Sequence, residues 1–300
     1  MLNLNNMKQT FNLEADTPWL IFGADSKKDP EFRIPSLRGI MRYWFRAVGN
    51  GFADWKKVRE LESKLFGSTE TASSFRLSGQ VMQQTESDTK ILPHKSNSTL
   101  KALFPCEVAL SILFRPGTGT TEKDAINAVL KLMVLLGGIG KRSRRGLGSF
   151  VNMNGFDEKT IAKEVDEQIA CIGKLFNDGV AVRSTPLQTN YPILSSTMAS
   201  IWKSSWTFEN EEEARRKIME ICHDKQPQAR DVFGYVNGTQ RLASRLHFRV
   251  HSTGEKEKRE YFILTTWFRV HEDNQFEMKV KEGLKDFTPI WGIGANAEAN

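Results

Sequence analysis

The sequence is poor in cysteine, with only Cys106, Cys171 and Cys222 among its 300 residues. The three cysteines lie far apart, and none belongs to a C-x-x-C pair. This spacing excludes a disulfide framework of the kind that holds small secreted domains together, and it excludes a zinc site built on cysteine pairs. We therefore expect three reduced thiols in a cytoplasmic protein.

The chain also lacks a long uninterrupted hydrophobic run. Its longest apolar segment contains Lys131 and ends at Gly137, which is too short to cross a bilayer. Residues 1–6 contain no cation and no long apolar core, so they do not resemble a secretory signal peptide. These features predict a soluble, cytoplasmic protein without a membrane partner.

Charge of one sign is only in modest excess. The chain has 42 lysines and arginines against 36 acidic residues, a formal net charge of +6 at neutral pH. This balance is consistent with an anionic partner such as nucleic acid, although it does not require one. A length of 300 residues is enough for two medium-sized domains.

Glycine and positive charge are concentrated in residues 137–150, GGIGKRSRRGLGSF. Glycine allows positive φ and close approach of another chain, and converging N–H groups and cations bind phosphates. The sequence therefore predicts a polyanion-binding loop, with a solvated turn as the alternative. Its candidate RNA-binding residues are Lys141, Arg142, Arg144, Arg145, Gly138, Gly140 and Gly146.

The elements around this loop exclude two familiar phosphate-binding motifs. The preceding residues 125–136 have the pattern of a helix, and the following residues 147–153 have that of a strand. A dinucleotide fingerprint needs the opposite order, and Ser143 stands where its third glycine belongs. A P-loop needs serine or threonine after its Gly-Lys pair, where this chain has Arg142.

A second basic feature lies on an amphipathic helix that begins near Ser36. Apolar residues recur at the i, i+3, i+4, i+7 and i+8 spacing of one helix face: Leu37, Ile40, Met41, Trp44 and Phe45. Beside this face runs an arginine stripe, preceded by Arg33 and formed by Arg38, Arg42 and Arg46. We expect Trp44 in the core, and the stripe either solvated or in contact with RNA phosphates.

The first half of the chain shows strand and helix patterns in the order β-α-β-β-α-β, which is typical of the ferredoxin-like fold. Strands are expected at residues 9–22, 75–82, 107–115 and 147–153, helices from residues 37 and 121, and an exposed loop at residues 85–99. The second half shows a weaker version of the pattern. The sequence thus predicts an α+β protein with ferredoxin-like domains at residues 1–155 and 156–300.

One short pattern occurs in both halves. Leu65-Phe66-Gly67 precedes an expected strand, as Val232-Phe233-Gly234 does later in the chain. A Phe-Gly turn before a strand is common by chance, so this repeat suggests an internal duplication without establishing one.

Several stretches of the first half resemble a known family. They are Thr17-Pro18 with Gly23-Ala24-Asp25, RIPSLRGIMRYWFRA at residues 33–47, LFGSTE at residues 65–70, and the basic glycine-rich loop. In order and spacing they resemble the RAMP superfamily, and within it the first-numbered RAMP subunits of type III-B CRISPR–Cas effectors, the Cmr complexes. The resemblance implies two tandem ferredoxin-like domains, binding of crRNA and single-stranded target RNA, and assembly with other Cmr-type subunits. It also implies that the subunit is not the nuclease.

Two enzymatic alternatives remain open. A metal-independent endoribonuclease would use His94, His247 or His251 as general acid or base. The alternation of residues 246–250 predicts, however, that His247, His251 and Arg249 lie on the solvated face of a strand.

A metal-dependent version would use carboxylates of one polar loop: Asp25, Asp29 and Glu31. Carboxylates in such loops are more often turn formers, and no group of His, Asp and Glu has convincing ligand spacing. We therefore expect no metal and no cofactor. A third role, docking of the basic loop onto an acidic protein, is compatible with RNA binding.

Overall fold

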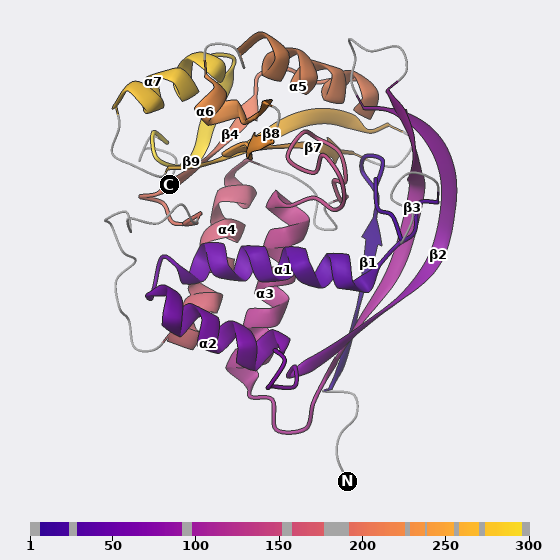
Figure 1. Ribbon diagram of the computed structural model, residues 1–300, viewed down its shortest axis with the longest axis vertical. Coiled ribbons are helices and arrows are strands. Elements are labelled where there is room, and N and C mark those ends of the chain that lie inside the picture. Colours follow the sequence, from indigo (N-terminus) through magenta and orange to yellow (C-terminus); the bar gives the residue numbers. More distant parts are fainter. Residues whose placement is uncertain are drawn as a thin grey trace.

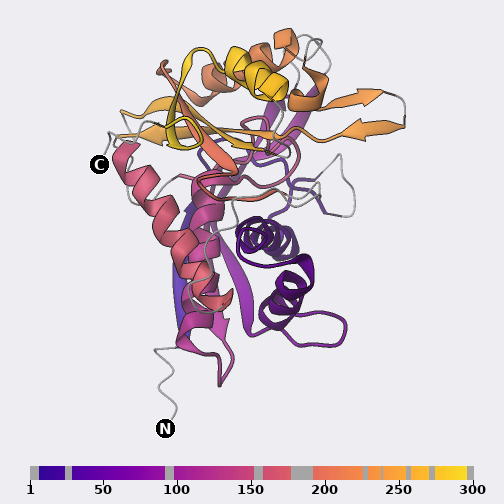
Figure 2. The same cartoon turned by 90° about the vertical axis from the view of Figure 1, so that its left-hand side faces the viewer.

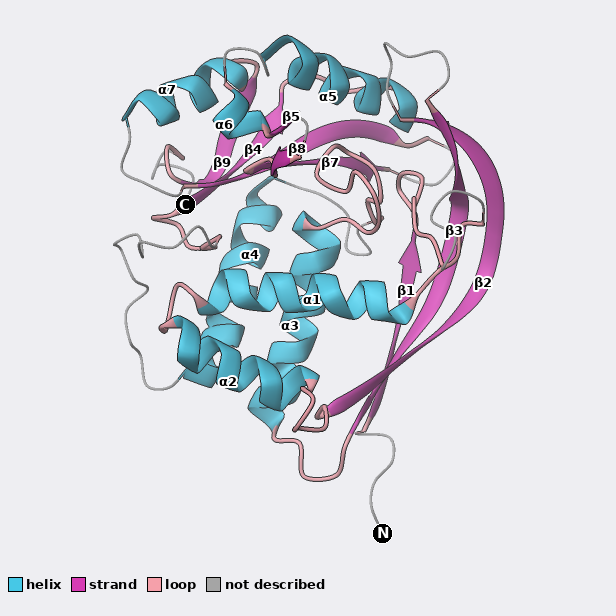
Figure 3. Ribbon diagram, viewed as in Figure 1, coloured by secondary structure: helices cyan, strands magenta, loops and turns pink. Residues whose placement is uncertain are grey.

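The computed structural model describes residues 7–23, 29–91, 98–151, 158–176, 192–225, 229–237, 239–254, 258–269 and 274–295. An antiparallel sheet organises each half of the chain (Figure 1, Figure 3). The elements of the first half are β1 (Lys8–Glu14), α1 (Ile34–Gly49), α2 (Trp55–Phe66), β2 (Phe75–Lys90), β3 (Thr99–Phe114), α3 (Thr120–Leu136), α4 (Glu158–Gly173) and a short 3-10 helix, Lys174–Phe176.

The first sheet has the strand order β1-β3-β2, and both strand pairs are antiparallel. The fourth strand of the ferredoxin-like pattern is reduced to a single bridge between Ala15 and Phe150. Gly146 and Gly148 interrupt an extended run because their φ values are 79° and 74°. The prediction of a strand at residues 147–153 is therefore wrong over the described residues; residues 152 and 153 lie outside them.

β2 and β3 are longer than the sequence pattern indicates. Each has 16 residues. β2 continues to Lys90 and so includes residues 85–90, which the polar composition of residues 85–99 had predicted to lie in an exposed loop. The cause of the error is that residues 79–86 lie exposed on the edge strand, so they show no apolar alternation. Residues 92–97 of the predicted loop lie outside the described residues. The long strands curve past the second half of the chain (Figure 1), where Arg215 donates to the Lys90 carbonyl.

α1 forms because its apolar residues fall on one helix face, and that face is buried. Its side chains pack with α2, α3 and α4 into a core on the inner face of the first sheet. Trp44 is fully buried there, which confirms its predicted place in the core. Across the described ranges, we find no helix with the length and apolar character that a membrane crossing requires.

The second half folds into a complete β-α-β-β-α-β unit with the sheet order β7-β8-β4-β9. Its elements are β4 (Ala199–Ser204), α5 (Glu211–Lys225), α6 (Arg230–Phe233), β5 (Tyr235–Asn237), β6 (Gln240–Leu242), β7 (Leu246–Thr253), β8 (Glu260–Phe268), α7 (Asn274–Gly283) and β9 (Phe287–Gly292). α5, α6 and α7 cover one face of this sheet (Figure 1). The prediction of an α+β protein with tandem ferredoxin-like folds is confirmed.

The opposite face of the second sheet packs against the helices of the first half (Figure 2). β7 and β8 are therefore buried along most of their length. His247, Arg249 and His251 are 8%, 2% and 0% exposed. The prediction that these residues face solvent is wrong: β7 does alternate, but its polar face lies between the two domains.

The buried polar side chains of β7 bond to the C-terminal end of α3. Arg249 donates to the carbonyls of Gly137 and Phe150, and Nε2–H of His251 donates to the Leu135 carbonyl at 2.9 Å. Carbonyls at the end of a helix lack intrahelical partners and carry partial negative charge, so a cation is favourable there. Burial nevertheless lowers the pKa of Arg249 to about 9.

α4 packs with the first domain although it follows the glycine-rich loop. Its apolar residues belong to the first core, against α3: Ile161, Val165, Ile169 and Ile172. The division between residues 155 and 156 stays a prediction, and this packing favours a division after Phe176 instead.

Both domains enter their second long strand through the same turn. Gly67 and Gly234 follow a helix with φ of 85° and 75° and ψ of 159° and 160°. Ser73 in the first domain and Ser244 in the second then bond to the carbonyls on either side of the turn. This shared hydrogen-bond pattern supports the internal duplication that the sequence suggests.

Candidate nucleic-acid interface

The glycine-rich loop, residues 137–148, lies against the edge of β7. Gly146 N–H donates to the Phe248 carbonyl, and Phe248 N–H donates to the Arg144 carbonyl. A side chain at Gly148 would collide with the backbone of the same loop, and its positive φ also favours glycine. The loop is thus a fixed link between the two domains.

Two of the four loop cations bond to the second domain. Arg145 donates to the Phe233 carbonyl and to the Cys222 sulfur, and Arg144 donates to the Ser244 carbonyl at 2.9 Å. These bonds do not leave the guanidinium groups free to follow a ligand. They hold the loop and its remaining N–H donors in one position.

The other two cations lie at the outer turn of the loop. Arg142 takes a positive φ of 58°, and burial lowers its pKa. Lys141 is exposed, and its ammonium group lies 4.7 Å from the centre of the Phe22 ring. The structure therefore spreads the four predicted phosphate ligands over the loop and does not gather them at one point.

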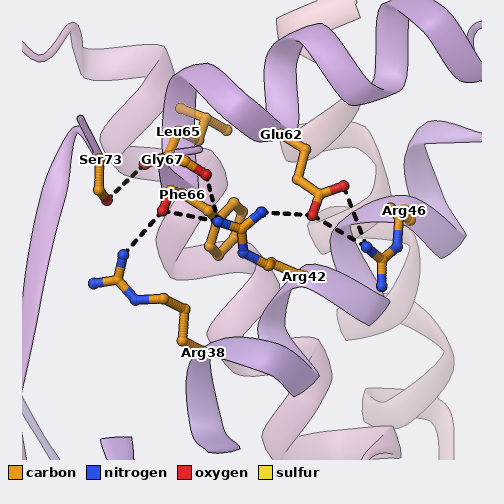
Figure 4. A network of polar contacts seen from close by, with 8 residues as sticks. All are labelled: Arg38, Arg42, Arg46, Glu62, Leu65, Phe66, Gly67 and Ser73. Atoms are coloured by element: carbon orange, nitrogen blue, oxygen red, sulfur yellow. Dashed lines mark hydrogen bonds and ion pairs between the residues drawn. The ribbon is translucent and has the colours of Figure 1, made fainter. Parts of the chain in front are cut away.

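The arginine stripe of α1 meets the C-terminal end of α2 (Figure 4). Arg38 and Arg42 donate to the Phe66 carbonyl at 3.0 and 3.1 Å. Arg42 and Arg46 share the buried carboxylate of Glu62 at 2.8 and 3.1 Å. The stripe thus fixes α2 against α1, yet the Arg46 side chain remains 45% exposed.

Two cavities adjoin along α1 and share Tyr43 in their linings. The smaller, of about 210 Å³, lies between α1 and the glycine-rich loop; the larger, of about 630 Å³, lies between α1 and α2. We call the two together the α1 groove. Its principal lining residues are Gly39, Tyr43, Gly138 and Arg144 at the narrow end, and Arg42, Arg46, Trp55 and Arg59 at the wide end.

The α1 groove is positively charged, because four arginines line it and Glu62 is the one carboxylate among its described lining residues. The Arg144 guanidinium lies 5.6 Å from the centre of the Tyr43 ring, a cation–π distance. The His247 ring stacks on the Tyr43 ring, and its Nε2 atom lies 3.2 Å from Tyr43 Oη. Burial, assisted by Arg144, holds the pKa of His247 well below its usual value, so it adds no charge at neutral pH.

The remaining predicted residues, Arg33, Gly140 and Gly146, do not line the groove. Arg33 donates to the Phe22 carbonyl at 3.4 Å, near the start of α1. Gly140 and Gly146 pack closely against protein atoms, and both take positive φ. We interpret the two glycines as residues that let the loop pack closely against the rest of the protein.

The structure describes some, but not all, of the candidates for catalysis. His94 and Asp25 lie outside the described residues, and His251 is buried at the domain interface. Within the part of the chain that the structure describes, no three His, Cys, Asp or Glu side chains gather in a way that could hold a metal ion.

Gly39→Ala is expected to raise the free energy of unfolding by about 0.5–1 kcal/mol, because glycine inside a helix is less favourable than alanine. Gly39 lies in α1, and a Cβ there would meet no atom within 4 Å. Urea denaturation measures the change. Gly49→Ala is the control in the same helix, because its Cβ would lie 2.7 Å from Phe176. A lower free energy of unfolding in Gly39→Ala would contradict the presence of open space around the Cβ position of residue 39.

Sequence reasoning missed part of the groove: Gly39, Tyr43, Trp55 and Arg59. A signal existed for the first two, because Gly39, Tyr43 and Arg46 have the i, i+4, i+7 spacing of one helix face. No local pattern shows that α2 folds back against α1, so Trp55 and Arg59 could not be assigned to the same site.

Residues 12–151, almost the whole first domain, match the family model of the RAMP superfamily. The crystal structure of Cmr1 from Pyrococcus furiosus in its apo form aligns with a TM-score of 0.59 and 18% identity, covering 95% of this chain and 99% of that one. A type III-B Cmr-beta cryo-EM structure bound to cognate target RNA contains a chain that aligns with a TM-score of 0.61 and 11% identity, covering 93% and 98%. The two-domain fold is thus shared with these structures, and the first domain of this chain resembles the RAMP superfamily.

Two curated relatives from Pyrococcus furiosus make the resemblance more specific. The Cmr subunit Cmr1-2 is 45% identical over 65 residues, which is 21% of this chain and 34% of the relative. The Cmr subunit Cmr1-1 is 28% identical over 157 residues, 47% of this chain and 46% of the relative. The matched stretches span about a third and about half of these relatives. Within the RAMP superfamily, the chain resembles the Cmr1 subunit of type III-B CRISPR systems.

Proposed function

We propose that this protein is the RNA-binding, Cmr1-type subunit of a type III-B CRISPR effector complex, and that it holds the backbone of crRNA or target RNA in the α1 groove. The observation that carries the proposal is the positively charged groove between α1, α2 and the glycine-rich loop. Gly39 in its lining allows a phosphate backbone to approach closely, because a Cβ there would meet open space. Such contacts are independent of base sequence, as suits a complex in which pairing between strands reads the target.

The similar proteins support the same conclusion. The curated relatives are Cmr subunits, and one of the similar assemblies was solved with its cognate target RNA. We infer RNA and other Cmr-type subunits as the partners of this chain. In this proposal Arg42, Arg46, Arg59 and Arg144 contact phosphates, whereas Arg38 and Arg145 hold neighbouring segments in place.

The proposed role is binding without cleavage. Tyr43 and His247 are the titratable pair at the junction of the two cavities, and they bond to each other. Burial raises the pKa of Tyr43 to about 12, and His247 is enclosed with a strongly lowered pKa. Such a pair is poorly matched to acid–base cleavage of RNA near neutral pH.

The double variant Arg46→Ala with Arg59→Ala is expected to flatten the dependence of log affinity on log salt by about 1.4, because each lost phosphate contact on a single strand contributes about 0.7. Removing Arg46 leaves Glu62 paired with Arg42, so the core beneath the groove stays intact. Fluorescence anisotropy of labelled single-stranded RNA across a salt series measures the slope.

The matched control is Lys281→Ala with Lys285→Ala, which removes the same charge from exposed positions of the second domain. It should leave the slope unchanged, and an equal flattening in both double variants would contradict a specific groove. RNA should stay intact on a denaturing gel; shortened RNA in the presence of EDTA would contradict the non-catalytic role.

A further inference from the structure

The wide end of the α1 groove carries an exposed tryptophan. Trp55 begins α2, is 51% exposed, and lines the larger cavity. A side chain of this size is usually well buried, and at a surface it presents a large flat apolar face. Its position beside a cavity therefore points to a ligand with a planar, weakly polar surface.

The charges around this tryptophan select the class of ligand. Arg59 lies one turn after Trp55 on α2, and Arg46 faces the same cavity from α1. Within the described residues Arg59 has no hydrogen bond or ion pair to another side chain. The Lys56 ammonium group lies 6.0 Å from the centre of the Trp55 ring. A ligand that combines a flat ring with negative charge fits these surroundings better than an apolar peptide does.

The size and floor of the cavity fit a single nucleotide. Its volume of about 630 Å³ lies within the usual range of small-ligand pockets. The buried Val58 lines it together with Ser63 and Ser68, so its lining combines apolar and polar residues.

We propose that this cavity is a subsite for one unpaired nucleotide of the bound RNA, whose base stacks on Trp55 while its phosphate contacts Arg46 and Arg59. The inference rests on the proposed function, because a strand in the narrow end of the groove reaches the subsite past Tyr43, which both cavities share. Stacking on an aromatic side chain is tolerant of base identity, so the subsite accepts any base.

The test is a scan with single-stranded RNA oligonucleotides that carry one abasic site at successive positions. Wild-type protein is expected to lose about 5- to 150-fold in affinity at one or two positions, the range of one stacked base. Trp55→Ala should bind the intact RNA that much more weakly and show no dependence on position. Its salt slope should equal that of the wild type, because no charge is removed. Trp55→Phe should keep the position dependence.

Met82→Ala is the matched control, since Met82 is 62% exposed on β2 and outside the groove lining; it should bind like the wild type. A wild type that binds RNA with a normal salt slope but equal affinity for every abasic oligonucleotide would overturn the subsite and leave the proposed function standing. Absence of RNA binding by the wild type would overturn both. Unchanged RNA affinity of Trp55→Ala with loss of co-purifying subunits would overturn the subsite in favour of a protein-docking tryptophan.

Discussion

Replacement of Arg249 by alanine is expected to lower the free energy of unfolding by about 3–5 kcal/mol, the usual effect of breaking a buried charged contact from one side. The carbonyls of Gly137 and Phe150 would lose their donor inside the domain interface. Asp16, buried nearby with its pKa raised to about 6 by burial, would lose a neighbouring positive charge. Urea denaturation of the full chain measures the loss.

Two variants separate the causes of this loss. Arg249→Met keeps most of the packed volume but no donors, so it should be nearly as unstable as the alanine variant. Arg216→Ala removes a charge from the exposed side of α5 and should change stability by no more than about 0.5 kcal/mol. Equal stability of Arg249→Met and the wild type would mean that the hydrogen bonds of Arg249 do not hold the domains together.

Acidification from pH 7.5 to 5.5 is expected to lower the free energy of unfolding by about 2 kcal/mol. Burial lowers the pKa of both His247 and His251 far below 6.5, so below that pH only the unfolded chain takes up their protons. Their stabilisation is present above pH 6.5 and is lost as the pH falls, by up to about 1.4 kcal/mol per unit for each histidine. Asp16 opposes this by about 1 kcal/mol, because its raised pKa makes the folded state bind a proton first.

His251→Gln isolates one histidine, because glutamine can donate to the Leu135 carbonyl without titrating. This variant should lose about 1.4 kcal/mol less than the wild type over the same pH interval. His223→Gln, at an exposed position, should behave like the wild type. An identical acid response of His251→Gln and the wild type would show that His251 is not buried in its neutral form.

Sequence analysis predicted parts of the candidate site correctly where the signal is a repeat of residues along a single helix. The apolar spacing of α1 predicts its helix and the burial of Trp44, and both are present. The three positions of its arginine stripe recur every four residues and lie along the same helix. What those arginines contact did not follow, because Glu62 and the Phe66 carbonyl belong to a different helix whose approach no local pattern encodes.

The second domain shows a different limit. Alternation in β7 correctly places His247, Arg249 and His251 on one face, but alternation cannot distinguish water from another domain on that side. The glycine-rich loop has the same difficulty. Its composition indicates a cation-bearing connection, while the acceptors that hold Arg144 and Arg145 lie far along the chain, so their structural role emerges only from the fold.

The contacts between the domains also set the order in which the site can be built during synthesis. Arg144 and its acceptor Ser244 are 100 positions apart, and Arg249 and Gly137 are 112 positions apart. The ribosome therefore releases the whole first domain well before β7, and domains generally fold as they emerge. Until β7 docks, Arg144 lacks its anchor and Tyr43 lacks the His247 ring beneath it. A chain that ends before β7 consequently lacks part of the lining at the narrow end of the α1 groove.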